Sequence, residues 1–226
     1  MTNIRTLFCA ALTCALGACA NSPAVQYFTL DDGRPAAMQS QAGPSIAIAQ
    51  VNLPELIDRP QLVVRAPGHQ VEINDMYAWA EPLRQQIPRL LAKSMGEELD
   101  SFNVVSLPMD AQDYDMDFYV TLDIQRLEAI AGEGVNLDVI WRVVSREGDV
   151  LTGRCMVSEP LTAKESENEY RTAVAAQSRA LKSLARKIAG VIAGWKAGAT
   201  SGAPAMGRSM NMPFDVSRKG GRRHVV

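Results

Sequence analysis

Three successive stretches of the chain alternate apolar and polar side chains with a period of two residues. The first starts at Phe118, the second at Val135, and the third is the run VLTGRCMVS, which starts at Val150. A period of two is typical of a strand with one buried face and one exposed face. Because only short turns such as REGD separate the stretches, they predict an antiparallel meander.

Shorter apolar runs ahead of the meander predict further strands. The run SIAIAQVNL at 45–53 is one of them, NVVSL at 103–107 is another, and YFTL at 27–30 is a candidate edge strand. The runs QLVVRA and QVEIN flank Pro67-Gly68, a pair that marks turns. These two runs therefore predict a β-hairpin.

Two stretches place apolar side chains at every third or fourth residue, which predicts helices over 81–102 and from Tyr170 to Trp195. In the first, Pro82 suits the first helical position, whereas Pro88 predicts a kink or a late start of the regular helix. The apolar stripe of the second has one polar member and alanine-rich flanks. These features favour packing against a sheet over a coiled coil.

Glycines recur every four residues near the end of the second predicted helix, at Gly190, Gly194 and Gly198. In a membrane, this spacing would suggest that two helices pair. The surrounding stretch is not long and apolar enough to span a membrane, so here the glycines indicate close packing and fraying of the helix end.

The predicted elements follow in the order β-β-β-α-β-β-β-β-α, with the candidate edge strand in addition. This order predicts an α+β fold in which two helices pack against one mainly antiparallel sheet. The length of the chain allows one domain plus a tail, or two small domains. The continuous order of elements favours a single domain over residues 27–196.

The chain begins with an apolar stretch that is too short to cross a membrane. Its ten residues, LFCAALTCAL, follow Arg5 and lead through Gly17 and Ala18 to Cys19, whereas a membrane-spanning helix needs about twenty. The stretch therefore predicts a signal peptide over residues 1–18. Its end resembles the lipobox of bacterial lipoproteins, in which the cysteine thiol is acylated and the cysteine becomes the first mature residue.

The lipobox resemblance implies that Cys19 carries fatty acyl chains such as palmitate and that residues 19–26 form a short tether. Two or more acyl chains hold a protein stably in a membrane, whereas one holds it weakly. Ala20 and Asn21 follow Cys19, so no aspartate stands at the second mature position. By resemblance to the sorting rule of enteric bacteria, this favours the outer membrane, with the protein facing the periplasm. The alternative is a plain secretory signal with a chance cysteine.

Four cysteines could form a disulfide framework, but their positions in the chain argue against it. Cys9 and Cys14 leave with the predicted signal and Cys19 is predicted to be acylated, so Cys155 stands alone. We therefore expect no structural disulfide, and we expect Cys155 to be a buried, inert thiol in a strand.

Charge is distributed unevenly along the chain. The formal net charge is −2, but residues 197–226 carry five basic side chains against Asp215, a net +4. With Arg5 in the signal, residues 19–196 carry −7, and an acidic body with a basic tail is not typical of a nucleic-acid-binding protein. The tail is rich in small residues and lacks an apolar period, so it is predicted to be disordered. Its end either touches anionic lipid headgroups or serves only as a solubilising, passive tail.

The chain offers no constellation of catalytic residues, so we expect neither an enzyme nor a bound cofactor. Its two histidines are His69, at the predicted hairpin turn, and His224, in the tail. Neither lies near a nucleophile motif or a pair of cysteines, so a catalytic triad and a zinc site have no support in the sequence.

The acidic run DAQDYDMD invites interpretation as a calcium loop through Asp113, Asp115 and Asp117. Such a loop needs a glycine where Phe118 stands and a bidentate glutamate where Ile124 stands. A solvated loop that enters a strand is therefore the better interpretation, and we expect no metal site.

Two stretches in the first half of the chain carry a family likeness. They are NLPELIDRPQLVVR, from Asn52 to Arg65, and YAWAEPL, from Tyr77 to Leu83, with YFTL upstream. Together with the lipobox, they resemble the PqiC-type auxiliary lipoproteins of bacterial transport systems, the ABC-type transport auxiliary lipoprotein family. The likeness extends from Cys19 to the end of the second predicted helix, and Pro88 departs from the family pattern.

This resemblance implies a non-enzymatic role beside an MCE-domain protein that spans the periplasm. Such lipoproteins contribute to phospholipid movement between membranes and to envelope integrity. The acyl anchor on Cys19 would hold this subunit on the outer membrane, where it receives the tip of the bridge. A homo-oligomeric ring of copies around that tip is compatible with the symmetry expected of the bridge.

The family stretches also contain the candidate partner-binding residues. Binding residues tend to lie on loops held by rigid elements, and Asp58 and Arg59 lie in such a loop, bounded by prolines. Our hypothesis is that a surface for a partner or for self-association is lined by Leu53, Pro54, Asp58, Arg59, Pro60 and Trp79. The alternative is structural, with an Asp-Arg pair that caps a turn and a tryptophan in the core.

Two other functions remain open from the sequence. A structural lipoprotein adapter of an outer-membrane assembly machine would share the anchor and the fold class, and only the two family stretches argue against it. A periplasmic hydrolase with an unfamiliar site is disfavoured because the chain lacks a nucleophile paired with a base.

Overall fold

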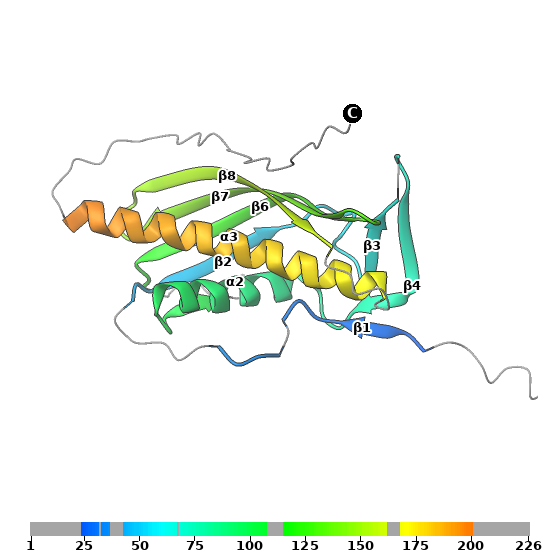
Figure 1. Cartoon of the computed structure of the whole chain (residues 1–226). Coiled ribbons are helices and arrows are strands. Elements are labelled where there is room, and N and C mark those ends of the chain that lie inside the picture. Colours follow the sequence, from blue (N-terminus) through cyan, green and yellow to red (C-terminus); the bar gives the residue numbers. More distant parts are fainter. Residues whose placement is uncertain are drawn as a thin grey trace, which may run out of the picture.

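The computed structural model describes residues 24–31, 33–36, 43–66, 68–107, 115–161 and 168–200, with side chains as far as residue 195. Within these ranges, eight strands form one sheet and two helices cover one of its faces (Figure 1). The predicted signal peptide, Cys19 and residues 201–226 lie outside the described residues. The elements are β1 (Gln26–Phe28), β2 (Ile46–Asn52), β3 (Gln61–Arg65), β4 (Val71–Trp79), α2 (Leu83–Leu99), β5 (Val104–Ser106), β6 (Phe118–Ile130), β7 (Gly134–Ser145), β8 (Val150–Pro160) and α3 (Glu169–Thr200).

The three alternating stretches form the predicted antiparallel meander of β6, β7 and β8. β6 pairs with β7 from its first residue to its last, and β7 pairs with β8 over almost its whole length. The apolar positions of the predicted pattern on β6 are buried, and the polar positions between them are partly or fully exposed. The turn between β6 and β7 contains Gly132 with φ of 72°, a conformation that favours glycine.

β6 is the central strand of the sheet, because β2 and β3 both pair with its other edge. β2 runs parallel to the first half of β6, with Ile46 opposite Phe118, and β3 runs parallel to its end, with Arg65 opposite Ile130. The sheet continues from β2 to β5 and from β3 through β4 to β1. The fold is α+β, as predicted, with antiparallel pairing in its longest ladders and parallel pairing between strands that are distant in sequence.

The predicted hairpin and the candidate edge strand are both present. β3 and β4 are antiparallel, and the N–H of Ala66 donates to the carbonyl of Gln70 at 3.1 Å beside the turn. β4 is longer than predicted, because it continues to Trp79. β1 pairs in parallel with the last residues of β4, with Phe28 opposite Trp79.

α3 covers the buried face of the meander (Figure 1). The stripe predicted to face a sheet is buried at Val174, Gln177, Leu181, Leu184 and Ile188. Alanines beside the stripe are buried too, and their small side chains let the helix lie close to the strands: Ala173, Ala176, Ala180, Ala185 and Ala189. At the end of the stripe, the ring centroid of Trp195 lies 5.7 Å from that of Phe118. Packing on a sheet therefore accounts for the stripe.

α2 starts at Leu83 and contains Pro88 in its second turn, so the helix does not start late. We expected Pro82 to be the first helical residue, but it is the N-cap, and the first helical residue is Leu83. Because Pro88 has no N–H, the carbonyl of Arg84 lacks its usual donor within the helix. The helix ends where Asp100 adopts a left-handed φ of 47°, and the N–H of Ser101 donates to the carbonyl of Gly96 at 2.9 Å.

Gly190 and Gly194 of α3 do not mark close packing, so the prediction is wrong for these two, and Gly198 lies beyond the residues whose side chains are described. Gly190 and Gly194 are exposed, and a Cβ atom added at either would meet no described atom within 4 Å. A close approach occurs instead at Gly153, where an added Cβ would lie 2.2 Å from the ring of Trp141. Trp141 is opposite Gly153 in the β7–β8 ladder, so the missing side chain makes room for the indole.

Candidate functional site

The loop between β2 and β3 contains most of the candidate partner-binding residues. β2 and β3 both follow the same edge of β6, so the loop carries the chain from the first half of that strand to its end. The N–H groups of Ile57 and Asp58 both donate to the carbonyl of Pro54, at 3.1 and 3.2 Å, and close a turn. Ile57 is buried and holds the loop to the core. The loop is therefore a defined surface on a rigid frame.

Asp58 is paired with Arg84, in the first turn of α2, and not with its neighbour Arg59. Nε of Arg84 donates to Oδ1 of Asp58 at 3.1 Å, and Nη2 of Arg84 donates to Oδ2. The hydrogen bond from Arg84 lowers the pKa of Asp58, against an opposite effect of burial. The structural alternative of an Asp-Arg pair therefore applies to Asp58, but the arginine is Arg84 and not Arg59. The bidentate pair ties the loop to the helix.

Arg59 lies beside this pair and is only half-buried. Its Nε atom is shielded from solvent and has no hydrogen-bond partner among the described residues. A buried donor without a partner costs free energy, and a ligand or partner that supplies an acceptor would recover it. Arg59 is thus the member of the predicted set whose bonding is left incomplete within the described part of the chain.

Trp79 lies at the end of β4, where the two family stretches meet. Its backbone N–H donates to the carbonyl of Pro60 at 2.7 Å, so the second stretch is bonded to the first. Its indole is only 6% exposed and belongs to the core. The prediction that Trp79 lines a surface is therefore corrected, and the tryptophan supports the loop from beneath.

The remaining predicted residues lie at or near the surface of the loop. Leu53 is half-buried and packs against the core, Pro54 is half-buried, and Pro60 is exposed. With Arg59, these three residues form what we name the loop surface: Leu53, Pro54, Arg59 and Pro60. The structure brings all six predicted residues into one region, with four of them on the loop surface, Asp58 in the ion pair to α2 and Trp79 in the core.

Sequence reasoning missed Gln86, the residue that joins β1 to α2. Gln86 is buried, its Oε1 accepts from the N–H of Leu30 at 2.8 Å, and its Nε2 donates to the carbonyl of Glu81 at 2.6 Å. Its position was a usable signal, because a glutamine three residues after Leu83 and four before Leu90 falls on the apolar face of the helix.

Aromatic rings extend the same junction to α3. The rings of Tyr77 and Tyr170 are stacked with centroids 3.9 Å apart, and Phe28 lies 6.2 Å from Tyr77. Burial raises the pKa of Tyr170, and a hydrogen bond with Asn74 opposes the effect. Strands β1 and β4 are therefore held to α3 by contacts between residues distant in sequence, which a local sequence pattern does not predict.

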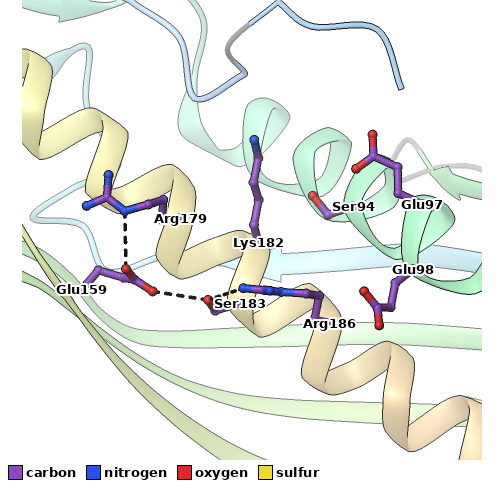
Figure 2. A pocket seen from close by; sticks show the side chains of 8 residues that line it. All are labelled: Ser94, Glu97, Glu98, Glu159, Arg179, Lys182, Ser183 and Arg186. Atoms are coloured by element: carbon purple, nitrogen blue, oxygen red, sulfur yellow. Dashed lines mark hydrogen bonds and ion pairs between the residues drawn. The ribbon is translucent and has the colours of Figure 1, made fainter. Parts of the chain in front are cut away.

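A groove of about 460 Å³ lies between α2 and α3, and we name it the interhelical groove (Figure 2). Its charged side chains are partly paired, since Glu159 accepts from Arg179 at 3.4 Å and from Ser183 at 3.3 Å. Carboxylates and cations occur in equal number along it, from Glu97, Glu98, Glu159, Arg179, Lys182 and Arg186. The hydroxyl oxygen of Ser94 is buried without a partner among the described residues. The groove has no net charge that would select one kind of ion.

A second groove of about 550 Å³ lies between β1 and α3, and we name it the β1–α3 groove. Its apolar lining includes Phe28, Leu30 and Val174, and the ring of Tyr27 stands beside them. Three cations from α3 also line it, Arg171, Arg179 and Lys182, and none of the described residues that line it is acidic. In charge it differs from the interhelical groove, which it adjoins at Arg179 and Lys182.

The other sequence interpretations concern the acidic run and the lone cysteine. Asp115 and Asp117 both pair with Arg146, and Asp117 also accepts from the N–H of Ser45 at 2.9 Å, so these carboxylates hold a loop that enters β6. Asp113 lies outside the described residues. Cys155 is buried, and burial raises the pKa of its thiol.

Two searches of the described ranges bear on other functions. They contain no group of three or more His, Cys, Asp or Glu side chains that could hold a metal ion. In the same ranges, neither helix is both long and apolar enough to cross a membrane.

Comparisons with known proteins agree with this fold. A family model described as the ABC-type transport auxiliary lipoprotein component matches residues 28–189. The crystal structure of an uncharacterised protein superposes with a TM-score of 0.58 at 15% identity, covering 75% of this chain and 99% of that one. A Xanthomonas campestris protein of family DUF330 has a TM-score of 0.55 at 16% identity, covering 78% of this chain and 97% of that one. No protein with a curated description matches the chain.

Proposed function

The chain belongs to the family of ABC-type transport auxiliary lipoprotein components, and we propose that it serves an MCE-type intermembrane phospholipid transport system. In this role it is the lipoprotein subunit anchored in the outer membrane, a non-catalytic docking component that supports envelope integrity. Its partner is the MCE-domain protein that spans the periplasm, and the membrane attachment is the acylated Cys19.

The observation that carries the docking role is the joining of the two family stretches. The ion pair between Asp58 and Arg84 and the bond between Trp79 and Pro60 fix the loop against α2 and β4. These bonds restrain the loop surface, and a restrained surface loses less entropy when it binds a partner. A surface of leucine, two prolines and an incompletely bonded arginine suits contact with another protein.

The anchor supports a location at a membrane surface, and the absence of an aspartate after Cys19 favours the outer membrane. Cys19 precedes Gln26 of β1 by seven residues, so the folded domain stays close to the membrane that holds its acyl chains. A subunit held in this way can receive the end of a periplasmic bridge without an enzymatic activity of its own. The family description, a transport auxiliary component, is in keeping with a role of this kind.

The test is a pull-down from gently solubilised envelopes with the wild-type chain and with the variant Cys19→Ser. We expect the wild type to recover an MCE-domain protein and the variant to lose it, because the variant cannot be acylated. Recovery of outer-membrane assembly proteins alone would contradict the proposal and would favour a structural adapter of an assembly machine.

A further inference from the structure

The β1–α3 groove combines an apolar lining with cations and lies where the chain leaves its anchor. We propose that this groove binds the anionic phosphate headgroups of the membrane that holds Cys19, so that a face of the folded domain rests on that membrane. The inference rests on the anchoring that forms part of the proposed function, and it adds a direct contact between protein and lipid.

The charge of the groove is suited to an anionic surface. Arg171 and Lys182 are eleven residues apart on α3, which places them about 16 Å from each other along the helix. Arg179 lies between them, where its Nη2 donates to the carbonyl of Pro160 at 2.7 Å and its Nε lies 3.4 Å from Oε2 of Glu159, so part of its charge is already paired. Cations spread over this length can meet more than one headgroup, and each is attracted by anionic lipid.

The apolar side chains of the groove suit the same environment. Tyr27 is 68% exposed although it lies on a strand, and Val25, two residues before it and outside the groove lining, is also exposed. Tyrosine is favoured at membrane interfaces, where its ring meets the apolar region and its hydroxyl stays in water. Long basic side chains behave in a similar way, with the stem on apolar surface and the charge among the headgroups.

The position of the groove follows from the short tether. Gln26 lies seven positions after Cys19, and a fully extended chain of seven residues spans at most about 25 Å. β1 lies near the N-terminal end of α3, and the C-terminal end of α3 lies at the opposite end of the molecule (Figure 1). The anchor therefore keeps β1, which forms one wall of the β1–α3 groove, within about 25 Å of the membrane.

The other charged surfaces do not share these features. In the interhelical groove, three glutamates line the wall together with the cations, two of which, Arg179 and Lys182, also line the β1–α3 groove. On the uncovered face of the sheet, Arg154 is paired with Asp138 at 2.8 Å and Arg65 with Glu128 at 2.6 Å. An acidic segment of a protein would also match the charge of the β1–α3 groove, but the short tether and the exposed Tyr27 favour the membrane.

The test measures vesicle binding by the mature chain from Ala20 onward, which keeps every described residue and carries no acyl group. The vesicles contain 30% phosphatidylglycerol in phosphatidylcholine, or phosphatidylcholine alone, and co-sedimentation gives the partition coefficient. We expect binding that prefers phosphatidylglycerol, and a loss of about fivefold for each cation removed in Arg171→Ala/Lys182→Ala. The basic tail is present in every variant, so its contribution cancels in the ratio.

The matched control is Arg126→Ala/Arg142→Ala, which removes the same charge from exposed positions on the uncovered face. Tyr27→Ser is a second variant that keeps the charge, and we expect it to weaken binding as well. Equal losses in the groove and control variants would overturn the proposal, and so would a groove variant that binds vesicles normally but fails to capture an acidic protein partner. The assay contains no MCE-domain protein, so its failure and the failure of the proposed function are distinguishable.

Discussion

The two halves of the sheet are held together in different ways. The meander half consists of β6, β7 and β8 with α3, and its strands pair in sequence order through short turns. The motif half consists of β1, β2, β3, β4 and β5 with the loop 53–60 and the start of α2. Apart from the β3–β4 hairpin, its strands pair with partners that are distant in the sequence.

Polar side chains reflect the same difference. In the meander half they bond between neighbouring strands, as Arg154 does with Asp138. In the motif half they connect separate elements, as Gln86 does between α2 and Leu30, two residues after β1. The meander therefore supplies the stable frame, whereas the candidate partner surface depends on a few long-range contacts assembled on that frame.

The largest expected effect is loss of core packing in the meander half. Leu122 is 2% exposed in the middle of β6, so Leu122→Ala should lower the free energy of unfolding by about 3 kcal/mol through lost burial and an internal cavity. Chemical denaturation followed by tryptophan fluorescence measures the change. The exposed neighbour is the control, and Asp123→Ala should stay within about 0.5 kcal/mol. A comparable loss in the control would contradict the assignment of the two faces.

A smaller and more local effect is expected in the motif half. Gln86→Ala leaves the N–H of Leu30 buried without an acceptor, which should cost about 1–3 kcal/mol. Hydrogen exchange should show loss of protection at Leu30 with β6 unchanged, because only the junction with β1 is released. The exposed neighbour Gln85 provides the control variant Gln85→Ala. Uniform loss of protection across the sheet would show that the two halves unfold as one unit.

The stacked rings of Tyr77 and Tyr170 join the two halves directly. A double-mutant cycle with Tyr77→Leu and Tyr170→Leu should give a coupling energy of about 0.5–1.5 kcal/mol, the usual contribution of an aromatic pair. A coupling energy near zero would mean that the rings contribute only through their separate burial, and that other contacts hold β4 to α3.

The smallest expected effect is the pH dependence of the two ion pairs. Hydrogen bonds from Arg84 and Arg154 lower the pKa of Asp58 and Asp138 below the ordinary value of 3.8. A lowered pKa in the folded state stabilises the protein above the unfolded pKa, and this contribution is lost as the pH falls through the folded value. Both pairs are partly exposed, so each should contribute less than about 1 kcal/mol.

The measurement for this prediction compares the wild type with Asp58→Asn and Asp138→Asn in urea denaturation between pH 7 and pH 2. The difference in unfolding free energy from the wild type should be largest near neutral pH and should shrink below pH 4. A difference that grew on acidification would contradict the direction of the pKa shifts.

The sequence predicted the meander half well, because residues close together in the sequence determine its strands and turns. The alternation from Phe118 to Ile124 reports which face of β6 is buried, and short turns leave antiparallel pairing as the simple connection. The stripe on α3 reports the face that meets the sheet in the same way. The glycine spacing in α3 gave a wrong prediction at Gly190 and Gly194, because spacing alone does not reveal whether another element packs against the glycines.

The motif half was predicted only in part. The hairpin and the grouping of the family stretches followed from the sequence, but the pairing of β2 and β3 with β6 joins strands that many residues separate. For the same reason, the partner of Asp58 was not the adjacent Arg59 but Arg84 on another element. The position of Trp79 in the core could not be read from its motif, since a surface tryptophan would have the same sequence.

The most direct test of the account measures binding of the mature chain to a purified MCE-domain partner. One variant, Asp58→Ala/Arg59→Ala, alters the loop and its surface, and the matched control, Asp138→Ala/Arg154→Ala, removes a similar pair from the meander half. The account predicts that the loop variant binds at least tenfold more weakly while the control binds as the wild type does. Wild-type affinity in the loop variant would contradict the central claim that the joined family stretches form the docking surface.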